Sequence, residues 1–218
     1  MLEKLIVFVE EPSMEAALEF LLPKLLGDVQ FQIIRFQCKD DLLKNAPERL
    51  RGYASWLPVD WRILVLVDRD DDDCVELKAK LESMAAAAGL LTKTAAGNDQ
   101  CFHVVNRIAI EELEAWFFGD WSAVRRAFPR VPATIPQKAG FRDPDAVAGG
   151  TWEAMERVLK RAGYFSAGLR KLELARSVAE HMSPQHNSSR SFQAFVGAVN
   201  AALVCRNSNP TVSLLHIV

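Results

Sequence analysis

A run of five aliphatic residues that ends in a cluster of acids constrains this chain most strongly. Residues 63–67 are Ile-Leu-Val-Leu-Val, and residues 68–73 contain five aspartates interrupted only by Arg69. Such a run predicts a strand buried on both faces of a parallel sheet. Sites in open α/β sheets form at the carboxyl ends of strands, and carboxylates crowded there repel one another unless a cation lies among them. We therefore expect a hard divalent cation, Mg²⁺ or Mn²⁺, at the end of this strand.

Predicted strands and helices alternate through the first half of the chain. The apolar patterns predict strands at residues 5–9, 29–38, 62–67 and 101–109. Helices are predicted at residues 15–26, entered through Pro12 and Ser13, at 40–57 with a break near Pro47, and at 73–89. Residues 110–118 predict a short helix or turn. This order is typical of a parallel sheet covered by helices on both faces.

The second half of the chain has a different character. Residues 128–150 are rich in proline and glycine, which indicates loops, and helical patterns follow at residues 151–162, 168–182 and 189–205. We therefore predict an α/β fold with a parallel-sheet core at residues 1–120. Residues 121–218 are predicted to be a loop-rich and helical extension packed on that core.

Composition limits the expected partners and compartment. The formal net charge of −2 lacks the strongly basic character of a protein that binds nucleic acid unaided. None of the four cysteines has the spacing of a zinc site, which favours a reducing, cytoplasmic environment. No apolar run is long enough to cross a bilayer, and the start of the chain lacks the pattern of a signal peptide. No membrane partner is therefore expected.

Acids follow three of the predicted strands. They are Glu10 after the first strand, Asp68, Asp70 and Asp72 after the third, and Glu111, Glu112 and Glu114 after the fourth. Because the carboxyl ends of parallel strands lie at one edge of a sheet, we expect these side chains to converge. Carboxylates two positions apart can bridge one or two metal ions, and two-metal sites stabilise both the attacking and the leaving oxygen of a phosphodiester displacement. For Asp72, capping of the following helix is the alternative.

Three segments resemble the motifs of Toprim domains. Residues 9–15, VEEPSME, resemble the strand-and-glutamate motif, and residues 67–70, VDRD, resemble the D-x-D motif. Residues 110–117, IEELEAWF, resemble the E-x-E segment of a Toprim-like bacterial family related to OLD nucleases. Lys171 and residues 163–165 and 187–195 resemble the C-terminal part of the same family. Members of that family accompany ABC- or SMC-type ATPases in phage-defence gene sets.

The resemblance implies roles for single residues. It implies that Glu10 holds a metal ion or acts as a general acid or base, and that Asp68 and Asp70 are metal ligands. Glu112 and Glu114 would complete a second metal position.

Lys171 and two departures from the motifs need separate mention. The resemblance makes Lys171 a candidate cation for a phosphate or a transition state, with an ordinary surface lysine as the alternative. Glu11 stands where the Toprim motif has glycine, which either changes the turn or adds another acid to the site. Met14 stands where an acid is usual.

Basic residues that could hold a phosphate backbone lie mainly in the loop-rich segment. The candidates are Arg125, Arg126, Lys138, Arg142 and Arg190. A solvated surface is the alternative for all of them.

Rival motifs fit the chain less well. An EF-hand that begins at Asp68 would have Asp73 where glycine is needed and Ala79 where a bidentate glutamate is needed. Glu76 and Lys78 form an E-x-K, but they lie within a predicted helix. The chain has no Walker A sequence and no G-x-G-x-x-G.

These observations predict a Mg²⁺- or Mn²⁺-dependent nuclease that cleaves DNA, with RNA as an alternative substrate. The resemblance adds a phage-defence role with an ABC- or SMC-type ATPase partner. A different class remains open, in which the chain is a non-catalytic subunit that binds an ATPase or holds a structural metal. The apolar residues 212–218 indicate either a contact in a homodimer or burial within one chain.

Overall fold

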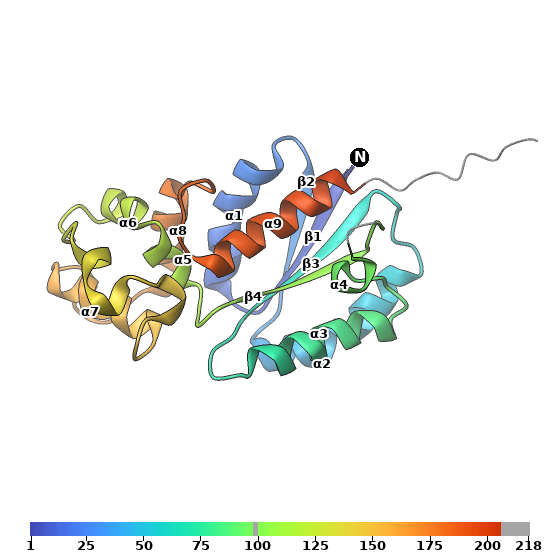
Figure 1. Ribbon diagram of the computed structural model, residues 1–218, viewed down its shortest axis with the longest axis horizontal. Helices are drawn as coiled ribbons and strands as arrows, with labels where there is room; N and C mark the ends of the chain where they lie inside the picture. Colours follow the sequence, from blue (N-terminus) through green and yellow to red (C-terminus); the bar gives the residue numbers. More distant parts are fainter. Residues whose placement is uncertain (98–99, 206–218) are drawn as a thin grey trace, which may run out of the picture.

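A parallel sheet forms the centre of the molecule. The computed structural model describes residues 1–97 and 100–205, so residues 212–218 and any dimer contact they make lie outside the described residues. Within this part, four strands pair in the order β2-β1-β3-β4, all parallel (Figure 1). The strands are β1 (Lys4–Val9), β2 (Gln30–Arg35), β3 (Trp61–Asp68) and β4 (Val104–Ala109). The predicted α/β fold with a parallel sheet is confirmed.

Helices cover both faces of the sheet, as the sequence predicts. Successive side chains of β1 and β3 point to opposite faces and are buried on each, which explains their unbroken apolar sequences. One face is covered by α1 (Pro12–Leu26) and α9 (Arg190–Val204), and the other by α2 (Lys39–Ala54) and α3 (Cys74–Ala87) (Figure 1).

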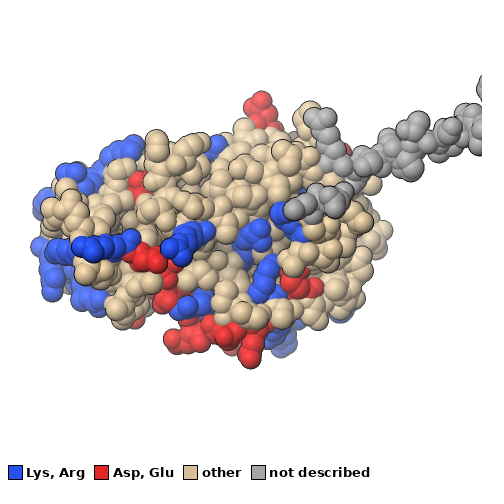
Figure 2. Space-filling model, in the orientation of Figure 1, with Lys and Arg blue, Asp and Glu red and all other residues tan. Residues whose placement is uncertain are grey.

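A group of shorter helices lies beyond the carboxyl ends of the strands, and we call residues 114–181 the helical lobe. It contains α5 (Glu114–Gly119), α6 (Trp121–Ala127), three 3-10 turns, η1 (Ile135–Gln137), η2 (Ala139–Phe141) and η3 (Pro144–Ala146), then α7 (Thr151–Arg161) and α8 (Lys171–His181). Helix α8 packs against α1 and α6, which joins the lobe to the sheet layer. Figure 2 shows lysine and arginine side chains gathered over the end of the lobe formed by α6 and α7.

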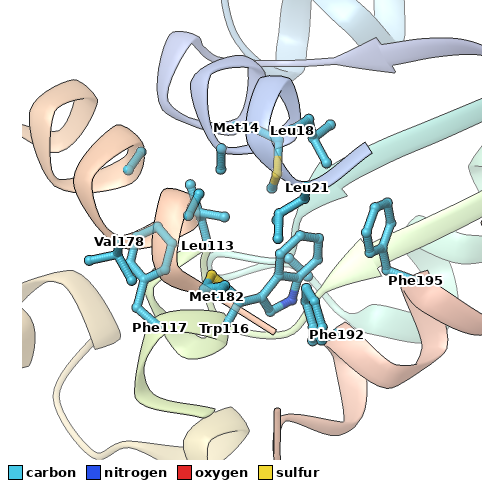
Figure 3. Packing of buried hydrophobic residues seen from close by; sticks show 14 of the residues in the cluster. Met14, Leu18, Leu21, Leu113, Trp116, Phe117, Val178, Met182, Phe192 and Phe195 are labelled. Carbon is cyan, nitrogen blue, oxygen red and sulfur yellow. The ribbon is translucent and has the colours of Figure 1, made fainter. Parts of the chain in front are cut away.

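Aromatic residues join the lobe to the sheet layer. Trp116 of α5 is fully buried and stacks on Phe195 of α9, with ring centroids 4.9 Å apart. Its indole nitrogen donates a hydrogen bond of 3.0 Å to Ser191 Oγ. Figure 3 shows this ring between side chains of α1, among them Met14, and those of α9. The last helix of the predicted extension therefore packs directly on the sheet.

The structure differs from the sequence prediction in three elements. The predicted break near Pro47 is wrong, because α2 runs continuously through this residue and buries Leu42, Ala46 and Leu50 on one face. Helices α4 (Lys93–Ala96) and α6 were not predicted, since four and seven residues are too short to show a helical apolar period.

A disulfide joins two segments that are far apart in the sequence. The bond between Cys101 and Cys205 links the segment before β4 to the end of α9, a pairing that was not predicted from the sequence. The Arg62 guanidinium lies 3.4 Å and 3.3 Å from the two sulfur atoms. Among the residues that the structure describes, no helix is long and apolar enough to cross a membrane.

Candidate functional site

Glu10 and Asp68 lie side by side at the carboxyl edge of the sheet. Glu10 directly follows β1, and Asp68 ends β3, which pairs with β1. The chain leaves β1 toward β2 on one side and later returns to β3 on the other, so these residues flank the point where the strand order reverses. The backbone N–H of Asp68 donates a hydrogen bond to Oε1 of Glu10. Both residues are only 5% exposed.

Burial changes the chemistry of these two acids. It raises the pKa of Glu10 to about 7, because the charged form loses its hydration. Burial, together with the carboxylates of Glu11 and Glu10, raises the pKa of Asp68 well above its ordinary value. Oδ1 of Asp68 is buried and has no hydrogen-bond partner among the residues that the structure describes. A buried carboxylate oxygen without a partner is costly unless a proton or a cation neutralises the group.

A third buried acid comes from the segment after β4. Glu114, in the first turn of α5, is 1% exposed, and burial raises its pKa to about 7. Its Oε2 also lacks a partner. We call Glu10, Asp68 and Glu114 the buried carboxylates. They come from the ends of three neighbouring strands, as the order of the acids in the sequence predicts.

Lys171, in the first turn of α8, interacts electrostatically with this group of acids. Burial lowers the pKa of its ammonium, but the carboxylates of Glu114, Glu11 and Glu112 outweigh this effect and raise it. Lys171 therefore remains charged. Its Nζ also lies 5.4 Å from the ring centroid of Trp152.

Glu112 has its carboxylate engaged by the protein. Its Oε2 accepts hydrogen bonds from Thr151 Oγ1 (2.9 Å) and from the backbone N–H of Trp152 (3.0 Å), at the first turn of α7. Its Oε1 lies 3.8 Å from Lys171 Nζ. In this geometry Glu112 holds the start of α7 and Lys171 next to the buried carboxylates.

Asp70 and Asp72 lie outside the buried group. Their side chains are 49% and 50% exposed, and both form ion pairs with Lys39, at 2.6 Å and 2.7 Å. A cavity of about 490 Å³ is lined by these three residues together with Glu10 and Glu11. The structure thus separates acids that appear equivalent in the D-x-D-x-D sequence.

The sequence left open whether Glu11 changes the turn or adds an acid to the site, and sequence reasoning missed Lys39. Glu11 has φ −138° and ψ 160°, an extended backbone that needs no glycine, and of the neighbouring charges its carboxylate acts most strongly on Asp68. Lys39 begins α2, the helix after β2. Because β2 is also parallel to β1, the start of α2 lies at the same edge of the sheet, and this topology was the signal that could have identified Lys39.

The predicted nucleic-acid residues do not form one cluster. Arg125 and Arg126 are exposed on α6, and Lys138 and Arg142 are exposed at either end of η2. Arg190, at the start of α9, instead lines a separate pocket beside β4 with residues of α3.

The donor chemistry of the buried carboxylates fits a hard divalent cation that keeps some of its own water. In the described part of the chain, no three acidic, histidine or cysteine side chains converge closely enough to enclose a metal ion by themselves. Mg²⁺ commonly binds through only one or two carboxylates, with water and substrate phosphate as its other ligands. The unpartnered oxygens of Asp68 and Glu114 are suited to that mode.

Comparisons with known proteins give a family without an assigned function. No curated protein matches the chain. Among solved structures, the chain is similar to the C-terminal region of the Burkholderia pseudomallei OLD protein, with a TM-score of 0.45 and 16% identity, covering 93% of this chain and 99% of that chain. The sequence model of a family described as "Domain of unknown function (DUF4276)" matches residues 9–200. The chain therefore belongs to the DUF4276 family.

Proposed function

We propose that this protein is a divalent-metal-dependent nuclease that hydrolyses phosphodiester bonds of DNA, with RNA as the alternative substrate. The observation that carries the proposal is the burial of three carboxylates at one sheet edge, two of which have an oxygen without a partner among the described residues. Folded proteins rarely bury acids in this way unless the group binds a ligand or takes part in chemistry.

Asp68 and Glu114, each of which has an unpartnered oxygen, would hold Mg²⁺ or Mn²⁺ together with water. When bound, such an ion supplies charge stabilisation at the scissile phosphate and lowers the pKa of an attacking water. Lys171 holds a fixed positive charge beside Glu114 and can bind a phosphate oxygen. Because burial raises the pKa of Glu10 to about 7, its carboxyl group can exchange a proton near neutral pH, as a general acid or base must.

The distribution of charge supports a polyanionic substrate despite the net charge of −2. Residues 121–218 contain 13 of the 26 lysines and arginines but only 6 of the 28 acids. The side chains of Arg157, Lys160 and Arg161 on α7 are exposed, as are Arg125 and Arg126 on α6. Figure 2 shows lysine and arginine side chains gathered over the end of the lobe that these two helices form, where they supply the attraction that the acidic sheet region lacks.

An ABC- or SMC-type ATPase partner and a role in phage defence are the second part of the proposal. They rest on the sequence resemblance to the Toprim-like family. An ATPase partner would control when the nuclease acts.

Plasmid cleavage tests the proposal directly. We expect Mn²⁺-dependent nicking by the wild-type protein that EDTA abolishes, and a loss of at least about 100-fold in Glu10→Gln and Asp68→Asn. Asp71→Asn is the matched control, because Asp71 lies in the same acidic loop but is exposed. Circular dichroism verifies that each variant is folded. If the folded wild-type protein, with and without a co-purified ATPase, leaves DNA and RNA intact, the non-catalytic alternative replaces the nuclease proposal.

A further inference from the structure

Lys39 lies in a position that has the oxygen ligands of a metal site. Its Nζ is 2.6 Å from Asp70 Oδ2, 2.7 Å from Asp72 Oδ2 and 3.0 Å from the backbone carbonyl oxygen of Arg69. The Lys39 side chain is 13% exposed, so the ammonium is largely removed from bulk water.

The three oxygens account for the whole hydrogen-bonding capacity of the ammonium. A lysine ammonium has three N–H donors and no acceptor, and here each donor has one oxygen. Two carboxylates and a backbone carbonyl are also the kind of donor set that hard divalent cations take in proteins. The ammonium and a divalent ion would therefore compete for the same three oxygens.

The backbone of the acidic loop fixes this arrangement. The N–H groups of Arg69 and Asp70 donate hydrogen bonds of 2.9 Å to the carbonyls of Ala109 and Glu111, which extends the pairing of β3 with β4 into the loop. Asp70 then adopts a left-handed backbone, with φ 49°. The Asp70 carboxylate pairs with Lys39, while Asp68 remains buried with one oxygen unpartnered.

A positive charge can therefore bind at two positions, beside the buried carboxylates and beside Asp70 and Asp72. At the second position the positive charge is the Lys39 ammonium. We propose that the Lys39 ammonium occupies the position of a second divalent ion, so that one ion binds at the buried carboxylates and none at Asp70 and Asp72. The count of one ion rests on the proposed function, whereas the role of Lys39 does not. On this proposal the Lys39 ammonium offsets one of the two negative charges of Asp70 and Asp72 and uses the oxygens that a metal ion would need.

Counting bound Mn²⁺ tests this role without measuring activity. Mn²⁺ alone is titrated into the metal-free protein, and free Mn²⁺ is followed by electron paramagnetic resonance. We expect one ion per chain for the wild-type protein and two for Lys39→Met, which frees the three oxygens. Lys44→Met, an exposed lysine on the same helix, should still bind one. Adding Asp72→Asn to Lys39→Met should remove the extra ion.

The outcomes separate the two proposals. Two ions in the wild-type protein, or no additional ion in folded Lys39→Met, would overturn the role of Lys39. No ion in the wild-type protein but one in Lys39→Met would support the role proposed for Lys39 and would overturn the proposal that the buried carboxylates bind a metal ion. No ion in either protein would overturn both. If Lys39→Met does not fold, Lys39→Gln is counted instead, because its neutral amide keeps much of the side-chain volume.

Discussion

Glu10 and Asp70 are both acids that follow a strand, yet they are in opposite electrostatic environments. Glu10 is enclosed by the sheet edge, and burial raises its pKa to about 7. Asp70 is half exposed and paired with Lys39. The pKa of the buried Glu10 carboxyl therefore changes strongly when a cation approaches, whereas the exposed Asp70 carboxylate is already paired with Lys39. The reactive part of this protein is therefore expected at the buried carboxylates.

The raised pKa values predict how the stability of the metal-free protein depends on pH. A carboxyl group with a higher pKa in the folded state than in the unfolded chain binds more protons when folded, so the free energy of unfolding falls as pH rises. For Glu10 and Glu114 this fall spans pH 4.5 to about 7. The pKa shift of each residue lowers the free energy of unfolding by roughly 3 kcal/mol at most across this range. Urea unfolding in EDTA at pH 5 and pH 8 measures the loss.

Two comparisons check the origin of that pH dependence. Glu10→Gln should show a smaller loss of stability between pH 5 and pH 8 than the wild-type protein, because the amide does not titrate. Mn²⁺ should stabilise the wild-type protein more at pH 8 than at pH 5, since metal binding must displace protons at the lower pH. Equal slopes for wild type and variant would show that Glu10 is not the group responsible.

The position of the acids at one edge of the sheet could be predicted from the sequence, but the extent to which each is buried could not. Each acid follows an apolar run, and that pattern correctly places Glu10, Asp68 and Glu114 at one edge. Whether an acid is buried depends on residues far away in sequence, such as Lys39 for Asp70 and the start of α7 for Glu112. No local pattern contains this information.

Among the secondary-structure elements, those that bury a continuous apolar face could be predicted from sequence. Strands β1, β3 and β4 and the longer helices have this property, whereas the apolar residues of β2 are only partly buried. The predicted bounds of these elements lie within a few residues of the observed ones. Helix α2 shows the limit of local rules, because a proline lies inside it at Pro47. The face formed by Leu42, Ala46 and Leu50 packs on the sheet and keeps the helix continuous.

Replacing that proline predicts a gain in stability. Pro47 cannot donate to the carbonyl of Leu43, so Pro47→Ala should restore one helical hydrogen bond and raise the free energy of unfolding by about 1–2 kcal/mol. The more flexible unfolded chain of the variant offsets part of the gain. Urea unfolding measures the change. Glu48→Ala, at the next and exposed position, should change stability by less than about 0.5 kcal/mol. A less stable Pro47→Ala would contradict this account of α2.

At the scale of the whole molecule, charge is divided between the sheet region and the C-terminal half. Residues 1–120 carry 22 acids against 13 lysines and arginines, whereas residues 121–218 carry 6 against 13. A bound polyanion is therefore expected to lie across the lobe and to reach the acidic edge only where cations neutralise it. The average net charge of the sequence conceals this division.

Charge reversal on the lobe tests this expectation. Arg157→Glu with Arg161→Glu should weaken binding of a DNA duplex at least about 10-fold at moderate salt and reduce the salt dependence, because fewer counterions are released. Lys44→Glu with Lys80→Glu makes the same change of charge on exposed residues of α2 and α3 and should have a much smaller effect. Fluorescence anisotropy in EDTA measures binding without cleavage. Equal losses in the two double variants would contradict a binding surface on the lobe.

The most direct test of the central claim is the position of Mn²⁺ in crystals of the wild-type protein, located by anomalous scattering. The account predicts a peak within about 2.5 Å of a carboxylate oxygen of Glu10, Asp68 or Glu114. It also predicts no peak at Asp70 and Asp72 while Lys39 is present. Peaks confined to the outer surface, with the buried carboxylates free of metal in soaked crystals, would contradict it.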